Sequence, residues 1–73
     1  MPLVDIHLVE GVFDTHEKEA MIRKVTDVMV SIEGEAMRGA TWVRVHELAS
    51  GEWGIGGQPM TTEALKAIRA RSA

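Results

Sequence analysis

The chain has 73 residues, of which 45% are hydrophobic, a formal net charge of −3 and no cysteine. The negative charge argues against a nucleic-acid partner, and no apolar run approaches the roughly 20 residues that cross a bilayer, so we expect a soluble cytoplasmic protein. Because so small a chain buries only about 60% of its unfolded surface, and disulfides are excluded, association between copies is the expected source of further burial.

The first predicted element is a strand over residues 3–9. Apolar side chains occupy every second position, at Val4, Ile6 and Leu8. This period of two is typical of a strand with one buried face. Pro2 opens the strand, at a position where a missing backbone N–H costs no ladder hydrogen bond.

A helix is predicted over residues 15–32. Asp14 and Glu17 have the spacing of a capping box, with Asp14 as the N-cap. Apolar residues then recur at spacings of three and four, which gives the helix one apolar stripe: Met21, Val25, Val28, Met29 and Ile32. Gly34 is the expected stop.

A second strand is predicted over residues 41–48, because this segment alternates and is rich in β-branched and aromatic residues. Trp42, Arg44 and His46 share one of its faces. Two parallel strands joined by a helix form one β-α-β unit with a right-handed crossover. Its sheet has open edges and an uncovered face, so we expect further copies to complete it into larger sheets.

The remainder of the chain is less regular. Four glycines within residues 51–57 exclude a regular helix there and predict a short hairpin or coil, with Trp53 and Ile55 as anchors. Residues 61–71 have a helix-forming composition, and this short terminal segment either docks on a neighbour or frays. We therefore expect an α/β fold in one domain over residues 1–73, with 61–73 as a terminal segment.

Four motifs follow one another in this sequence: Pro2 at the start of a strand, Glu10-Gly11 at its end, Ile22-Arg23-Lys24-Val25 in an acidic-capped helix, and Gly54-Ile55-Gly56-Gly57 after an aromatic residue. Their order and spacing resemble the 4-oxalocrotonate tautomerase family of the tautomerase superfamily, over about residues 2–59. The resemblance implies small β-α-β subunits assembled as a homohexamer, formally a trimer of dimers. It also implies a small-molecule substrate and no cofactor.

The resemblance implies an enol–keto tautomerase, an isomerase in which the amino-terminal proline is the general base and then the general acid. The proline moves a proton between oxygen and carbon of a 2-hydroxydienoate or a related enol. Met1 is expected to be removed, because a small residue follows it, and its removal leaves Pro2 as a secondary amine. An apolar pocket would keep this amine neutral by disfavouring its charged form.

The substrate-binding positions depart from the family pattern. Well-studied members carry an arginine directly after the Glu-Gly pair, where this chain has Val12 and Phe13. A second family arginine corresponds to Trp42 in a gapless register, or to Arg44 with a two-residue gap. Trp53 occupies the position of the aromatic residue before Gly-Ile-Gly-Gly. We therefore expect Arg44, Trp53 and Trp42 to bind a substrate that is less charged than a dicarboxylate.

Alternatives remain open. Arg44 is equally suited to an intersubunit salt bridge, and Trp42 to anchoring an interface. His7 and His46 would share a metal only with a third ligand, which the spacing does not offer, so no metal site is predicted. The functional alternatives are a hydratase, dehalogenase or decarboxylase-type activity of the same superfamily, and an oligomeric module without catalysis.

Overall fold

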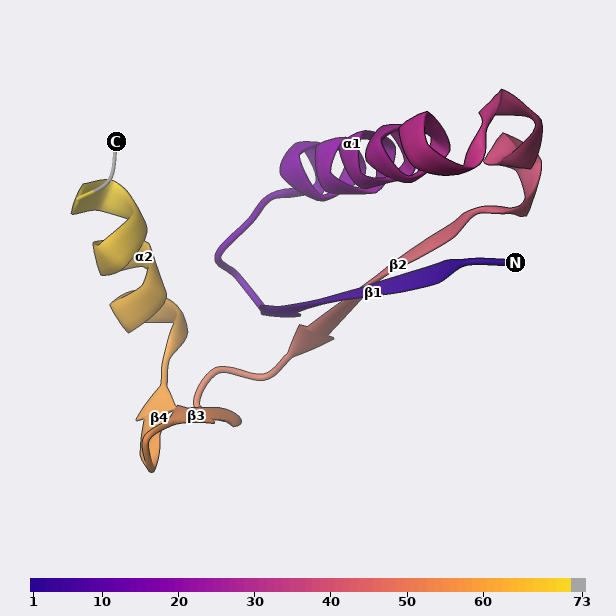
Figure 1. Ribbon diagram of the computed structural model, residues 1–73. Helices are drawn as coiled ribbons and strands as arrows, with labels where there is room; N and C mark the ends of the chain where they lie inside the picture. The colour runs from indigo at the N-terminus through magenta and orange to yellow at the C-terminus, as the bar shows by residue number, and fades with distance from the viewer. Residues whose placement is uncertain (72–73) are drawn as a thin grey trace.

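The structure, a computed structural model, describes residues 1–71. Its elements in chain order are β1 (Leu3–Val9), α1 (Thr15–Glu33), the 3-10 helix η1 (Glu35–Ala40), β2 (Trp42–Leu48), β3 (Trp53–Ile55), β4 (Gln58–Met60) and α2 (Thr62–Arg71). Figure 1 shows α1 along one side of the β1–β2 sheet, with β3, β4 and α2 beyond the carboxyl end of the two strands. Residues 72 and 73 of the predicted terminal segment lie outside the described residues.

The strands β1 and β2 pair in parallel over their whole length, with Leu3 opposite Trp42 and Val9 opposite Leu48. The chain passes between them through α1, so the predicted β-α-β unit is confirmed. Each of the two strands has a partner on one edge only within residues 1–71, because β3 and β4 form a separate sheet. The structure therefore leaves two sheet edges open in a single chain.

The two faces of the β1–β2 sheet differ in exposure, as the alternation predicts. The face towards α1 is half-buried and carries apolar side chains such as Val4, Ile6 and Val45. Glu47 of β2 lies on the same face as Val45 and forms a salt bridge with Lys18 of α1 (3.0 Å), so this face is the one turned towards the helix. The opposite face is more exposed and mixes aliphatic, aromatic and polar side chains: Leu3, Asp5, His7, Trp42, Arg44 and His46.

The predicted boundaries of α1 are confirmed by its caps. The Asp14 carboxylate accepts a hydrogen bond from the Glu17 N–H (2.8 Å), and the Glu17 carboxylate accepts one from the Asp14 N–H (3.1 Å). At the other end Gly34 has a φ of 104°, which favours glycine, and its N–H donates to the Val30 carbonyl (2.8 Å). The short helix η1 follows directly and was not predicted from the sequence.

The glycine-rich segment folds as a hairpin, which decides between the two predicted forms. β3 and β4 are antiparallel, with Trp53 opposite Met60 and Ile55 opposite Gln58. Gly56 and Gly57 connect them with φ values of 58° and 84°. Two consecutive positive φ angles characterise the two-residue turn that matches the natural twist of a hairpin.

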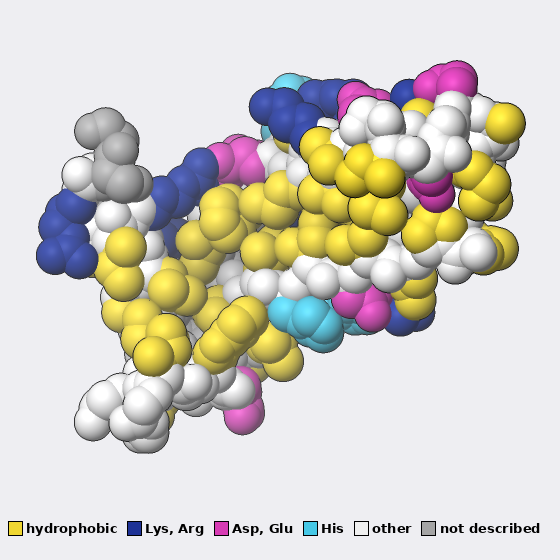
Figure 2. All heavy atoms as spheres, viewed as in Figure 1, with side chains coloured by type: hydrophobic (Ala, Val, Ile, Leu, Met, Phe, Trp, Pro, Cys, Tyr) yellow, Lys and Arg dark blue, Asp and Glu magenta, His cyan; other side chains and the backbone are white. Residues whose placement is uncertain are grey.

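The chain has a small core of its own. Val9 and Val30 are the buried apolar residues of the described segment, at 4% and 5% exposure. Several large apolar side chains remain exposed: Met1, Leu3, Ile22, Val28, Ile32, Trp42, Ile55 and Ile68. Figure 2 shows a continuous band of hydrophobic side chains from α1 to the hairpin and α2. Such exposure is typical of a surface that another chain covers. None of the helices within residues 1–71 has both the length and the apolarity needed to span a membrane.

Candidate active site

Pro2 lies at the amino end of β1, beside the first residue of β2. Its carbonyl oxygen accepts a hydrogen bond from the Trp42 N–H (3.0 Å), which begins the ladder between the two strands. Pro2 is half-buried, whereas Met1 is 78% exposed. Here Met1 is attached to Pro2, so the proline nitrogen is part of a peptide bond. Trp42, the predicted substrate contact nearest to Pro2, is 54% exposed.

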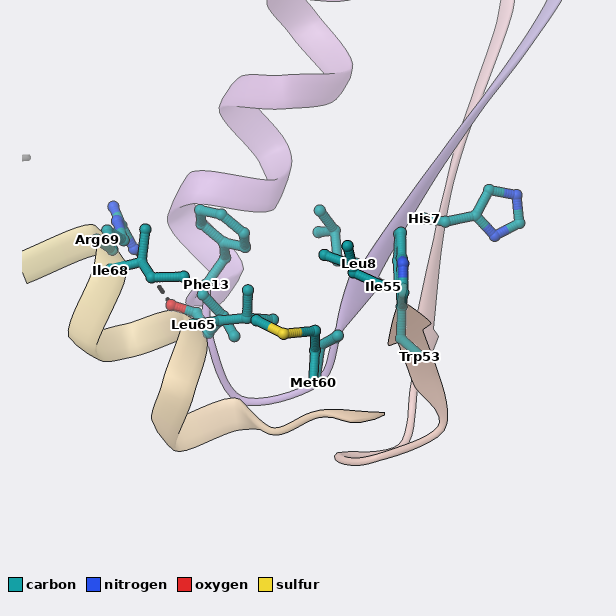
Figure 3. Close-up of a pocket in the computed structure, with 11 residues that line it drawn as sticks. His7, Leu8, Phe13, Trp53, Ile55, Met60, Leu65, Ile68 and Arg69 are labelled. Atoms are coloured by element: carbon teal, nitrogen blue, oxygen red, sulfur yellow. Dashed lines mark hydrogen bonds between the residues drawn. The ribbon is translucent and has the colours of Figure 1, made fainter. Parts of the chain in front are cut away.

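An apolar cavity of about 330 Å³ lies at the other end of the sheet, between β1, the hairpin and α2. Figure 3 shows Phe13 and Leu65 on one side of this cavity, Leu8 and Trp53 on the other, and Met60 between them. We call it the Trp53 pocket. Trp53, which the sequence predicted to contact a substrate, is one of the residues that line this pocket.

The structure does not bring Pro2 and Trp53 together within one chain. Pro2 precedes the first residue of β1, whereas the strand reaches the Trp53 pocket only at His7 and the two residues after it. A strand of seven residues spans roughly 23 Å at 3.3 Å per residue. The predicted base and the predicted aromatic wall therefore lie at opposite ends of β1.

Arg44 lies on the sheet face turned away from α1 and forms a two-point ion pair with Asp5. Its Nε is 2.9 Å from one carboxylate oxygen and its Nη2 is 3.2 Å from the other. His46 Nε2 lies 3.0 Å from Asp5 Oδ1. The bonds from Arg44 and then from His46 lower the pKa of the Asp5 carboxyl to about 2, and the Asp5 carboxylate raises the pKa of Arg44. Arg44 thus has a partner within its own chain.

Asp5 lies beside His7 and His46 and could serve as the third metal ligand that the sequence pattern did not reveal. The ligand atoms of these three residues lie within 4.8 Å of one another, and the two imidazole rings stack with centroids 4.8 Å apart. Zinc accepts such ligands. However, Arg44 already occupies both oxygens of Asp5, and its positive charge opposes a cation there. We therefore describe the group as a hydrogen-bonded cluster of Asp5, Arg44 and His46, with the His7 ring stacked on His46.

Arg69 of α2 is a pocket residue that the sequence did not reveal. Its Nη1 donates to the Val12 carbonyl (3.2 Å) and to the Glu17 carboxylate (3.1 Å), and its Nη2 pairs with the other oxygen of Glu17. The guanidinium carbon lies 4.7 Å from the centre of the Phe13 ring. Arg69 and Val12 are 57 positions apart, so no local pattern could indicate this contact.

Residues 2–63 match the family model described as Tautomerase enzyme. The chain belongs to the tautomerase family. The match begins at Pro2 and ends at the second residue of α2, so most of that helix, including Arg69, lies beyond it. Members of this family are enzymes of tautomerase type, which places the chain in the isomerase class that its motifs predicted.

Solved structures confirm the predicted resemblance to 4-oxalocrotonate tautomerase. The apo form of an unfused 4-OT is 28% identical, with a TM-score of 0.72, and the alignment covers 88% of this tautomerase and 98% of that chain. DmpI from Helicobacter pylori is 28% identical, with a TM-score of 0.68 and coverage of 80% and 94%. TomN, a 4-oxalocrotonate tautomerase homologue in the tomaymycin biosynthetic pathway, is 26% identical, with a TM-score of 0.72 and coverage of 99% and 97%. No match is found among curated proteins.

Proposed function

We propose that this tautomerase catalyses enol–keto tautomerisation with Pro2 as its base. Removal of Met1 leaves a secondary amine, which takes the proton from the enol oxygen. The carbonyl forms as the C=C electron pair shifts, and that pair takes a proton at carbon from the ammonium of Pro2. The observation that carries this proposal is the family match, which begins at Pro2. The 78% exposure of Met1 supports its accessibility to an aminopeptidase.

The site is shared between two copies in this proposal. One chain holds Pro2 at one end of β1 and the Trp53 pocket at the other end. Two copies related by a two-fold axis, with their open β1 edges side by side and antiparallel, bring Pro2 of each copy to the pocket of the other. The exposed Leu3 and Trp42 would be covered by such association. Three of these dimers would form the expected homohexamer.

The environment of the pocket suits the proposed base. Its walls are almost entirely apolar, and apolar surroundings disfavour the charged form of an amine. Pro2 would therefore remain neutral and able to accept a proton. The substrate is a small enol such as a 2-hydroxydienoate, with Trp53 against its carbon chain. Trp42 beside Pro2, and Arg44 on the same sheet face, are the further proposed contacts.

Two measurements test this proposal. Intact mass spectrometry of the protein made in its native host is expected to show a mass without Met1. Ketonisation of enolised phenylpyruvate and of 2-hydroxymuconate is then followed for the wild type and for Pro2→Ala, whose small second residue also permits removal of Met1. The proposal predicts loss of turnover in the variant while the oligomer persists. Retained methionine, or unchanged turnover in Pro2→Ala, would contradict it.

A further inference from the structure

The Trp53 pocket has apolar walls and one charged side chain at its edge. Among the side chains of residues 1–71 that line it, Arg69 is the one Lys, Arg, Asp or Glu, and His7 is the one other ionisable group. A pocket of this size accepts a small molecule, and apolar walls favour an apolar ligand body. A fixed guanidinium at the edge of such walls favours a carboxylate on that ligand, because arginine binds carboxylates through two parallel N–H bonds.

The fold positions Arg69 by anchoring α2 to the end of β1. The Thr62 hydroxyl donates to the Glu10 carbonyl (2.6 Å), and the Thr62 N–H donates to the Ser50 hydroxyl (2.9 Å). These bonds fix the first turn of α2 beside Gly11. Arg69 is two turns further along the helix, where Figure 3 shows it beside Ile68 on the α2 side of the pocket. The position of the guanidinium is thus set by the docking of the helix.

Arg69 places its positive charge beside the segment that follows Glu10-Gly11. Its partners Val12 and Phe13 directly follow Glu10-Gly11. In this segment the chain has Val12 and Phe13 in place of the arginine expected from the family pattern. Most of α2 lies beyond the family match. The cation therefore comes to the pocket from the carboxyl-terminal part of the chain.

We propose that Arg69 binds the carboxylate of the substrate, and that the pocket selects monocarboxylates with an apolar body. This inference rests on the proposed function for the view that the Trp53 pocket holds the substrate. Glu17 is a competitor for Arg69, because its carboxylate pairs with the guanidinium when no ligand is present. The side chains of Arg69 and Glu17 are 46% and 32% exposed, and ion pairs so accessible to solvent exchange partners at little cost.

Binding of unreactive probes tests the inference separately from catalysis. The probes are 3-phenylpropionate and its neutral amide, 3-phenylpropionamide, titrated into the full chain while the NMR signal of the Trp53 indole N–H is followed. The wild type is expected to bind the carboxylate about tenfold more tightly than the amide. Arg69→Gln is expected to abolish this preference, and Arg69→Lys, which keeps the charge without the planar fork, to retain part of it.

Two control variants distinguish ligand binding from a structural role of the ion pair. Arg71→Gln makes the same charge change on the same helix, outside the pocket lining, and is expected to leave the preference unchanged. Glu17→Gln keeps an acceptor for the capping box but removes the competing charge. It is expected to bind the carboxylate at least as tightly as the wild type, whereas a purely structural ion pair predicts weaker binding in both Glu17→Gln and Arg69→Gln.

The outcomes separate this inference from the proposed function. Equal binding of the two probes to the wild type, no binding of the carboxylate, or an unchanged preference in Arg69→Gln would overturn the inference. Arg69-dependent binding in a protein that lacks ketonisation activity would contradict the proposed function and leave the inference intact. Ketonisation that requires Pro2, without a carboxylate preference, would contradict the inference alone.

Discussion

In the proposed function, the two ends of β1 contribute different parts of one site. At the amino end, Pro2 is set by a backbone hydrogen bond to Trp42 and lies outside the lining of the Trp53 pocket. At the carboxyl end, the hairpin and α2 enclose apolar walls with Arg69 at their edge. Within one chain, the proposed base therefore lies outside the pocket, and the residues that line the pocket include no Pro2. The comparison teaches that, if Pro2 and the Trp53 pocket belong to one site as proposed, that site requires two copies of the chain.

The largest effect is expected at the amino end. Pro2→Ala should lower kcat roughly hundredfold or more, since a general base contributes about 10²–10⁴-fold. Binding of 3-phenylpropionate to the Trp53 pocket should persist, because Pro2 is not among the residues that line this pocket. Steady-state kinetics and the indole titration measure the two quantities. Equal losses of turnover and binding would contradict the assignment of proton transfer to Pro2 and of ligand binding to the Trp53 pocket.

A smaller effect is expected at the carboxyl end. Trp53→Ala should raise KM about tenfold, because truncating a pocket wall leaves the ligand with less apolar contact. Trp53→Phe keeps an aromatic wall and should lie close to the wild type. Kinetics of enolised phenylpyruvate over a range of concentrations separate KM from kcat. A KM of Trp53→Ala equal to that of the wild type would contradict the proposal that the Trp53 pocket binds the substrate.

The smallest effect is expected in the middle of β1, at Asp5. The hydrogen bond from Arg44, followed by that from His46, lowers the pKa of Asp5 from 3.8 to about 2 in the folded chain. A lowered pKa contributes stability above the unfolded value and loses it as pH falls through the folded value. The stability difference between the wild type and Asp5→Asn should therefore be present at pH 5 and disappear between about pH 4 and pH 2. Urea unfolding across this range measures it, and a constant difference would contradict the ion pair.

The β-α-β unit could be predicted because its signals are local. The capping box at Asp14 and Glu17 involves residues three positions apart. The helix ends at Gly34, where a single glycine adopts a positive φ. The alternation of β1 identified its buried face without knowledge of its partner. Pro2 and Trp53 could be proposed as site residues because they belong to motifs with a fixed order along the chain, and their roles stay predictions.

The remaining features depend on contacts between distant segments. The cluster of Asp5, His7 and His46 requires the register in which His7 lies opposite His46, which alternation does not determine. Arg69 reaches the pocket from α2, whose first turn Thr62 anchors to Glu10 and Ser50. The hairpin and α2 also decide where the pocket lies, so the sequence could name Trp53 but not its separation from Pro2.

The most direct test of the shared site is to mix two damaged chains. Pro2→Ala retains the Trp53 pocket, and Trp53→Ala retains the base. Refolding equal amounts of the two variants together allows their copies to combine, and native mass spectrometry verifies the hybrids. The assay uses substrate well below the wild-type KM, where a tenfold higher KM leaves Trp53→Ala with about a tenth of the wild-type activity. A two-fold dimer with shared sites would then recover about a quarter of the wild-type activity, because half of the dimers are hybrids and each has one intact site of two. Hybrids with no more activity than the two variants measured apart would contradict the shared site.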